Sequence, residues 1–366
     1  MPTALLVGAF GQRNPGDDAL LEAFVAALPS WRVLVATSSP GALANGAVDA
    51  RSPRAVGRAL LRSDALVVAG GTVFKTLHPG SGRRPLSLLL KAVGLTAAAR
   101  ALGKPRALVG VGAGVLDSSM SRRLARALVR QTDLLVLRDE ESADVLAAAG
   151  ARAPFRVGAD AAWTLLDAPR PGPRGPGRRI VVALSFLAGG AELPERLAAG
   201  LAPLVDAGYD VRLQPWQVTG NGIDDLALAE AVNERLPRQL PLLRPPEDLS
   251  RARDEFAAAD FVVGLRFHAL IAAAAAGTPF VGVAHEPKHA GLTRRLDQPA
   301  VAAGEPPSAL TRAIVDGLRG PAPSPQAVKE EIEAAEAGMQ LLRLLLAGGR
   351  APGAAELEGL PLRPAA

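Results

Sequence analysis

Short apolar runs alternate with longer helical segments along this chain, and no other feature of the sequence limits its fold as strongly. Most of these runs are continuous rather than alternating, which is expected of strands buried on both faces of a parallel sheet. In the first half they lie at residues 4–7, 32–36, 65–69, 106–111 and 134–137. The helical segments between them lie near 18–28, 53–62, 85–102, 120–131 and 139–149. The first half is therefore predicted to be a domain of repeated strand–helix units.

A stretch rich in proline and glycine separates this domain from a second one of the same kind. Residues 167–179 read DAPRPGPRGPGRR, and this stretch cannot continue a helix or a central strand. Beyond it, strands are predicted at 179–185, 210–213, 260–264 and 279–284. The helices expected in this half lie near 192–207, 224–236, 269–276, 306–319 and 325–347.

We therefore expect an α/β protein with two Rossmann-like domains whose parallel sheets face each other across a cleft, where ligands of such sheets usually bind. The length of 366 residues suits about two domains. The expected parts are an N-terminal domain at 1–168, a linker at 169–178, a C-terminal domain at 179–347 and a flexible tail at 348–366.

Composition excludes several kinds of protein. The chain has no Cys, which removes disulfides, thiolate nucleophiles and Cys-ligated metals. The longest apolar stretch, 269–284, is broken by Gly277 and Pro279 and is shorter than the roughly 18 residues of a membrane span. The arginines are scattered, without a basic stripe interleaved with aromatic residues, so no nucleic-acid partner is expected. Because the N-terminus lacks the pattern of a signal peptide, we expect a cytoplasmic protein.

Glycine-rich loops follow several of the predicted strands. The first, GAFGQRNPGDDALL at 8–21, lacks both GxGxxG and GK[ST], so neither a dinucleotide site nor a P-loop is supported. Its Asn14, Gly16 and Asp17 could form a helix cap or part of a ligand site. Further glycines follow later strands at Gly70, Gly71 and Gly112. Glycines at this edge of a sheet either turn the chain or let a ligand approach the backbone.

Basic side chains also cluster where predicted strands end. Arg138 either pairs with a neighbouring carboxylate such as Asp139 or points into the cleft. Arg266 and His268 lie two residues apart, between the strand that ends at Gly264 and a very apolar helix. A third group, His285-Glu286-Pro287-Lys288-His289, gathers three titratable cations at the end of the next strand. Pro287 interrupts the helix that an HExxH metal site would need, so no metal site is expected.

Taken in order, these motifs resemble the polysaccharide pyruvyl transferase family, especially its bacterial cell-wall, CsaB-like branch. The similarity spans about residues 4–297. The opening motif of the family, GNxGDEA, is matched by Asn14, Gly16, Asp17, Asp18 and Ala19, with Asp18 where Glu is usual. Later motifs are matched by Gly70 and Gly71 (GGG), Gly112 and Gly114 (GxG), 138–142 (RDxxS), Arg266 and His268 (RLH) and 277–288 (GxPxxxxxYDPK).

This sequence departs from the family pattern at two places. His285-Glu286 replaces the usual Tyr-Asp, and Phe186 occupies a strand end where many members carry Arg. The second change could alter acceptor contacts or remove one anion contact.

The resemblance implies a GT-B-like arrangement of the two domains and the transfer of a pyruvyl group from phosphoenolpyruvate to a sugar of a cell-wall or surface polysaccharide. Phosphoenolpyruvate is then a co-substrate, and no cofactor is required. Its carboxylate and phosphate suit the guanidinium groups of Arg138 and Arg266 as bidentate partners. His268 is the candidate acid, because imidazole can give up a proton near neutral pH.

The remaining site residues are assigned by the same resemblance. Catalysis is expected from His268, Arg266 and Asp17, with Asp17 as the candidate hydroxyl base. Donor binding is expected from Arg138, Arg266, His268, Gly264 and Lys288. The acceptor side or its loops are expected to include Asn14, Gly16, Gly70, Gly71, Gly112 and His285.

Two other functions stay open at this point. A GT-B glycosyltransferase that uses a nucleotide sugar would have the same architecture, and a non-catalytic glycan- or anion-binding relative would suit the two departures. The acceptor is either a polysaccharide or a lipid-linked precursor, and the latter would bring the protein to the inner face of the membrane. A homo-oligomer is also left open.

Overall fold

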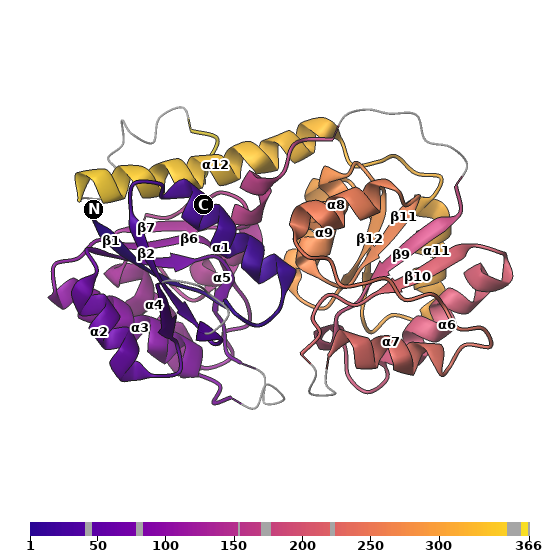
Figure 1. The fold of residues 1–366 in the computed structure, drawn as a ribbon, viewed down its shortest axis with the longest axis horizontal. Helices are drawn as coiled ribbons and strands as arrows, with labels where there is room; N and C mark the ends of the chain where they lie inside the picture. Colours follow the sequence, from indigo (N-terminus) through magenta and orange to yellow (C-terminus); the bar gives the residue numbers. More distant parts are fainter. Residues whose placement is uncertain are drawn as a thin grey trace. The chain divides into compact units, whose positions relative to one another are not determined.

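The computed structural model of the chain describes residues 1–40, 46–77, 83–152, 154–169, 177–219, 224–349 and 360–364. It divides into two compact units. The first contains Met1–Gln12, Leu20–Thr164 and Glu331–Ala366, and the second contains Arg13–Ala19 and Leu165–Glu330. Each unit is an α/β domain with its own sheet (Figure 1).

The sheet of the first unit is built from strands that are mostly buried on both faces. Its strands are β1 (Thr3–Val7), β2 (Arg32–Thr37), β3 (Ala47–Asp49), β4 (Ala65–Ala69), β5 (Thr72–Phe74), β6 (Arg106–Ala113), β7 (Leu134–Leu137), β8 (Arg156–Val157) and β14 (Arg363–Pro364). Their order is β14-β8-β7-β6-β4-β1-β2-β3, with β5 paired to β6. Among these described strands, β14 alone runs antiparallel to its neighbour. The predicted parallel sheet is therefore confirmed.

Helices cover both faces of this sheet. They are α1 (Pro15–Ala27), α2 (Pro53–Arg62), α3 (Ser87–Ala101), α4 (Ser119–Gln131), α5 (Glu140–Ala148), the short 3₁₀ helix η3 (Ala161–Leu165) and α12 (Pro325–Gly348). On one face, α3 and α4 pack together over a core that includes Leu108, Leu128 and Leu135. On the other face lies α12, where a Cβ added at Gly338 would contact the side chains of Val109 and Val136 (Figure 1).

The second unit has a smaller sheet, and all of its strands are parallel. The strands are β9 (Arg179–Ala183), β10 (Asp210–Gln214), β11 (Phe261–Gly264), β12 (Phe280–Ala284) and β13 (Ala300–Ala302), in the order β10-β9-β11-β12-β13. The helices are η4 (Phe186–Ala188), α6 (Leu193–Asp206), α7 (Asp225–Asn233), α8 (Leu249–Ala257), α9 (Phe267–Ala275), α10 (Pro287–Arg295) and α11 (Pro307–Gly317). Apolar residues of α6, α7 and α11 form one core with β9, β10, β11 and β12.

Strand order locates the point in each sheet where ligands are expected. In the first sheet β1 is followed by β2 on one side and β4 on the other, and in the second sheet β9 lies between β10 and β11. In each sheet, the connections on either side of the central strand, β1 or β9, run in opposite directions. This leaves a crevice at the carboxyl end of that strand, where ligands of such sheets bind. The loops after β1 and β4 in the first unit, and after β9 and β11 in the second, therefore border the expected ligand sites.

The units differ from the expected domains at both chain ends. Residues 13–19 were expected in the N-terminal domain but group with the second unit, because they pack against α9 there. Residues 331–347 were expected in the C-terminal domain but belong to the first unit, where α12 packs on its sheet. Most of the expected linker, 170–176, lies outside the described residues.

The predicted flexible tail also needs a correction. The backbone of Arg363–Pro364 forms β14 and pairs with β8, which adds a strand to the edge of the first sheet. Two paired residues give no apolar periodicity, so the sequence carries no signal for this strand. Residues 350–359 of the tail lie outside the described part of the chain. Within the described part, no helix is both long enough and apolar enough to cross a membrane.

Candidate functional site

Arg266 lies at the expected ligand-binding edge of the second sheet, between β11 and α9. It is the last extended residue before α9, and its side chain reaches the end of β9, where Nε donates to the carbonyl oxygen of Leu184 over 3.1 Å. Gly264 keeps the strand-to-helix connection tight, because a Cβ there would lie 2.3 Å from Leu270. Gly264, predicted to bind the donor, therefore has a packing role in this structure.

A carboxylate that the sequence analysis did not predict holds Arg266 in place. Asp225, the first residue of α7, accepts hydrogen bonds from Nε and Nη2 of Arg266, each at 2.9 Å. Gln217 accepts a further one from Nη2 at 3.1 Å. Asp225 is fully buried and Arg266 is 8% exposed, so the pair is shielded from water. Such charge-assisted, forked pairs fix geometry strongly.

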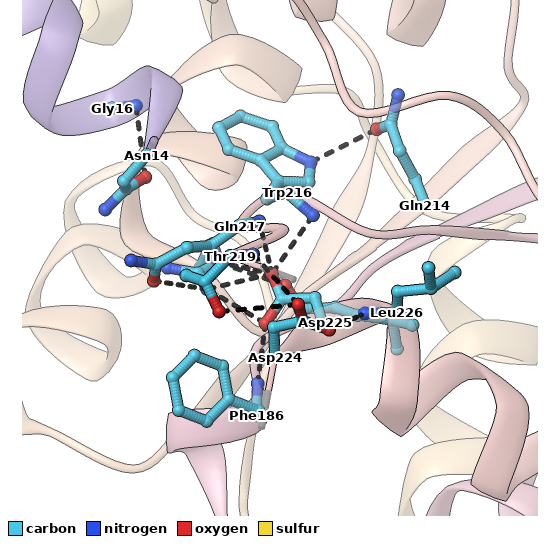
Figure 2. Close-up of polar contacts among 12 residues, drawn as sticks. Asn14, Gly16, Phe186, Gln214, Trp216, Gln217, Thr219, Asp224, Asp225 and Leu226 are labelled. Atoms are coloured by element: carbon cyan, nitrogen blue, oxygen red, sulfur yellow. Dashed lines mark hydrogen bonds and ion pairs between the residues drawn. The ribbon is translucent and has the colours of Figure 1, made fainter. Parts of the chain in front are cut away.

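Asp225 also fixes the ends of two strands. Its Oδ1 accepts from the backbone N–H of Phe186, and its Oδ2 accepts from those of Trp216 and Gln217, all within 3.0 Å. Figure 2 shows Phe186, Trp216 and Gln217 converging on this carboxylate. Phe186, which departs from the family pattern, thus touches the site through its backbone, whereas its partly buried ring packs against the core of the second unit.

The pairing changes what Arg266 can offer to a ligand. Among the described residues, Nε and Nη2 of Arg266 are used and Nη1 has no hydrogen-bond partner. The sequence predicted that two nitrogens of Arg266 would bind an anion together, but one of them would have to be Nε or Nη2, which already donate to Asp225. In this structure Arg266 can therefore contact an anion only through Nη1.

His268 is the second residue of α9, and its side chain lies against the first turn of α1. A Cβ added at Gly16 would lie 2.1 Å from Nδ1 of His268, so the imidazole occupies the space that glycine leaves. This contact explains a glycine at this position without any ligand. It also places the α1 motif and the Arg266-x-His268 motif in the same unit, although the α1 motif was expected in the N-terminal domain.

Asp17 is buried, but positively charged side chains also act on it. Burial raises the pKa of Asp17 above its ordinary value, while the charges of His268, Lys288 and Arg266 oppose that rise. Nδ2 of Asn14 donates to Oδ2 of Asp17 at 2.7 Å, and Oδ1 of Asn14 accepts from the backbone N–H of Gly16 at 3.2 Å. Asn14 thus caps the helix and orients Asp17, so these contacts show the helix-cap alternative, and the catalytic role of Asp17 stays a prediction.

The group at 285–289 differs from its prediction. Burial and the charge of Lys288 lower the pKa of His285 to about 4. The same causes, in the same order, lower the pKa of His289 well below its ordinary value. The two rings lie 4.3 Å apart between centroids, in a space where a charged imidazole would be poorly solvated. The three titratable cations expected here are therefore reduced to one at neutral pH.

Lys288 is the cation that remains in this group. Its Nζ forms an ion pair with Glu286 at 2.5 Å and lies 5.6 Å from the ring centre of Phe267. Pro287 occupies the first turn of α10, so His285 lies before the helix and His289 within it. The two histidines of the HExxH spacing therefore do not share one helix, as expected from Pro287.

Arg138 lies in the first unit, directly after β7, and it is 3% exposed. Its Nε donates to Oδ2 of Asp139 at 2.9 Å, and its Nη1 is 3.6 Å from Oδ2 of Asp160. Although burial alone would raise the pKa of Asp139, the charge of Arg138 and hydrogen bonds from Ser142 lower it overall. The pairing alternative for Arg138 is the one that the structure shows.

The predicted glycines of the first unit surround this arginine and the loop after β4. A Cβ at Gly112 would lie 2.3 Å from Nη2 of Arg138, so glycine makes room for the guanidinium. The backbone N–H of Gly112 donates to the carbonyl oxygen of Gly71 at 2.8 Å. Gly70 and Gly71 both have positive φ, at 58° and 72°, which favours glycine sterically.

Sequence reasoning missed Asp225 and Gln217. Asp225 follows Asp224 ahead of an apolar run, a pattern typical of a helix N-cap, and Asp224 does cap α7 by accepting from the N–H groups of Leu226 and Ala227. Nothing in that pattern reveals that the second carboxylate turns inward to Arg266. Gln217 lies in the irregular segment after β10, which gives no periodic signal.

Comparison with solved structures shows which fold these units share. MnaA of S. aureus, solved with UDP, aligns over 95% of this chain and 97% of its own, with a TM-score of 0.61 and 12% identity. The UDP-GlcNAc 2-epimerase of Methanocaldococcus jannaschii aligns over 95% and 100%, with a TM-score of 0.60 and 12% identity. HepE of Anabaena, solved with UDP-glucose, aligns over 95% of this chain and 100% of its own, with a TM-score of 0.60 and 15% identity. These identities establish the fold class alone: two parallel-sheet α/β domains of the GT-B type.

Comparison at the level of sequence identifies the family. No curated protein gave a significant match to the chain. A family model described as polysaccharide pyruvyl transferase matches residues 14–287, a span that runs from Asn14 to Pro287 and contains Arg138, Asp225, Arg266 and His268. The chain belongs to the polysaccharide pyruvyl transferase family.

Proposed function

We propose that this protein transfers the pyruvyl group of phosphoenolpyruvate to two hydroxyl groups of a sugar, forming a ketal and releasing phosphate. The sugar belongs to a cell-wall or surface polysaccharide or to its lipid-linked precursor. One observation carries the proposal: in the second unit, the first turn of α1 lies against His268, and the charges of His268, Lys288 and Arg266 all lower the pKa of the buried Asp17 in that turn. A small donor that bears both a carboxylate and a phosphate requires basic groups gathered in this way.

The chemistry assigns a role to each of these groups. His268 donates a proton to the methylene carbon of phosphoenolpyruvate, and one sugar hydroxyl forms a bond to the adjacent carbon as its own proton passes to Asp17. The second hydroxyl then adds to the same carbon as the bond to the phosphate oxygen breaks, and its proton leaves with the phosphate. The contact between the first turn of α1 and His268 supports return of the first proton from Asp17 to His268. No cofactor is needed for these steps.

The donor is bound by Lys288 and by Nη1 of Arg266, with Arg138 a further proposed contact. Because Arg138 is already paired with Asp139 and Asp160, its first role is to order the loop after β7. The loops of Asn14, Gly70 and Gly112 and the neutral imidazole of His285 are assigned to the acceptor.

The test is incubation with phosphoenolpyruvate and cell-wall glycan intermediates, with phosphate release and product mass as the readouts. We expect phosphate and a glycan that is heavier by one pyruvyl ketal per phosphate released. Phosphoenolpyruvate that binds but is not consumed with any glycan would instead indicate a non-catalytic relative.

A nucleotide-sugar glycosyltransferase is the second candidate, favoured by the structural similarity to proteins solved with UDP or UDP-glucose. Thermal-shift measurements separate the two candidates, because a ligand stabilises the protein that binds it. Stabilisation by phosphoenolpyruvate and not by UDP-sugars supports pyruvyl transfer, and the opposite result supports the glycosyltransferase.

A further inference from the structure

We propose that Asp225 is a positioning residue, which orients Arg266 so that a single guanidinium nitrogen, Nη1, binds the anionic donor. The inference rests on the proposed function for the identity of that donor. Asp225 acts through Arg266 and through the backbone around it, and it does not itself touch the donor.

The contacts of Asp225 leave its carboxylate no capacity for a ligand. Its two oxygens accept from Nε and Nη2 of Arg266 and from the backbone N–H groups of Phe186, Trp216 and Gln217. Five donors on two oxygens exceed the four lone pairs of a carboxylate. Asp225 is also fully buried, so neither water nor substrate reaches it.

Counting the N–H groups of Arg266 gives what is left for the donor. A guanidinium has five N–H groups: one on Nε and two on each terminal nitrogen. The N–H of Nε is shared between Leu184 and Asp225, and the two on Nη2 face Asp225 and Gln217. Within the described part of the chain both N–H groups of Nη1 remain, so Arg266 can bridge two oxygens of one phosphate or carboxylate from a single atom.

Because of this arrangement, Arg266 contributes to donor binding mainly by directing its N–H groups at the donor, and not by adding net positive charge. Its positive charge is largely balanced by Asp225 at 2.8 Å, and the charges of His268 and Lys288 lower the pKa of Asp17 more than the charge of Arg266 does. Removing Asp225 leaves the charge of Arg266 in place but releases the side chain. Donor binding should then weaken more than the chemical step.

The experiment compares Asp225→Asn with Asp224→Asn. The two positions are adjacent, both lose one carboxylate, and Asp224 caps α7 without a hydrogen bond to Arg266. Asn is also a good N-cap, so the control variant should fold and keep its activity. We expect Asp225→Asn to raise KM for phosphoenolpyruvate about 10- to 100-fold, with a smaller fall in kcat. Asp224→Asn should change KM less than about threefold.

Gln217→Met serves as the second variant, because Asp225→Asn could fail to fold. It removes one hydrogen bond to Nη2 and leaves the Asp225–Arg266 pair intact, so KM should rise by about three- to tenfold. A double-mutant cycle with Arg266→Met completes the test. If Asp225 acts through Arg266, Asp225→Asn has no further effect on KM in a protein that already carries Arg266→Met. Equal effects of Asp225→Asn in both backgrounds, or an unchanged KM in Gln217→Met, would overturn the inference.

A readout without substrate keeps this inference separate from the proposed function. In a ¹⁵N-arginine-labelled protein, the buried Nε–H of Arg266 should exchange slowly with solvent, and it should exchange faster in Gln217→Met and in Asp225→Asn than in Asp224→Asn. If wild type shows these exchange rates but does not bind phosphoenolpyruvate, the proposed donor is wrong and the positioning of Arg266 stands. Fast exchange in wild type contradicts the positioning itself.

Discussion

The carboxylate of Asp225 and the guanidinium of Arg266 form a buried, forked pair with two hydrogen bonds of 2.9 Å. The pair joins the end of β11 to the start of α7, and the same carboxylate holds the segments that follow β9 and β10. Three neighbouring strand ends of the second sheet are thus tied to one buried group. Changes to this pair should therefore affect stability as well as donor binding.

Arg266→Lys tests whether the planar fork, and not the charge alone, is required. Lys keeps the positive charge but cannot donate to Asp225 and Gln217 in the fixed directions of a guanidinium. We expect the free energy of unfolding to fall by about 1–3 kcal/mol and KM for phosphoenolpyruvate to rise at least tenfold. Urea denaturation and steady-state kinetics measure the two effects.

The matched control is Arg253→Lys. Arg253 forms an ion pair with Asp254 at 2.8 Å, but both side chains are much more exposed, at 29% and 56%. Exposed pairs contribute about 0–1 kcal/mol, so this variant should unfold at nearly the wild-type urea concentration. Equal destabilisation by the two substitutions would mean that the burial of the Asp225–Arg266 pair is unimportant.

Gly16→Ala tests the contact between the first turn of α1 and His268. The new methyl group would lie 2.1 Å from Nδ1 of His268, so the imidazole must move. We expect kcat to fall at least tenfold, because general acid catalysis depends on the position of the acid. Gly94→Ala is the control: nothing lies within 4 Å of a Cβ there, and in the middle of α3 alanine should stabilise the helix by roughly 0.5–1 kcal/mol. Normal turnover by Gly16→Ala would separate His268 from the chemistry.

The sequence alone was sufficient to predict the two parallel sheets, because continuous apolar runs separated by helical segments have few other solutions. The family resemblance assigned Asp17, Arg266 and His268 to catalysis and Asn14 and Gly16 to the acceptor side, and the structure brings all five into one unit although the first three in the chain were expected in the other domain. Those residues carry a signal because each interrupts an apolar pattern at the end of a strand or the start of a helix. The sequence also favoured pairing for Arg138, which has a carboxylate next to it in the chain.

Other features left no trace in the pattern. The role of Asp225 depends on a contact with a residue 41 positions away, whereas locally it looks like part of a helix cap. The low pKa of His285 arises from burial and from Lys288 in three dimensions, although the sequence places three cations together. The assignment of Arg13–Ala19 to the second unit likewise depends on packing against His268, and not on the linker composition from which boundaries were predicted.

His268→Ala should separate donor binding from turnover. If His268 supplies the proton to the methylene carbon, kcat should fall by about 10²- to 10⁴-fold. Binding of phosphoenolpyruvate, measured by thermal shift, should persist in part because Lys288 and Arg266 remain. His285→Ala is the comparison, since its imidazole is neutral at pH 7 and is not assigned to proton transfer. Loss of turnover by His285→Ala with normal turnover by His268→Ala would reverse the two assignments.

The neutral imidazole of His285 predicts how stability depends on pH. Burial lowers its pKa from 6.5 to about 4 in the folded protein, so between these values the unfolded chain binds more protons than the folded one. Stability should therefore be complete above about pH 6.5 and should decline as the pH falls toward 4, with His289 adding to the same trend. Urea denaturation from pH 7.5 to 4.5 measures this slope in wild type and in His285→Gln, which cannot titrate. The variant should show a shallower decline over this window, and parallel curves would mean that His285 is protonated equally in both states.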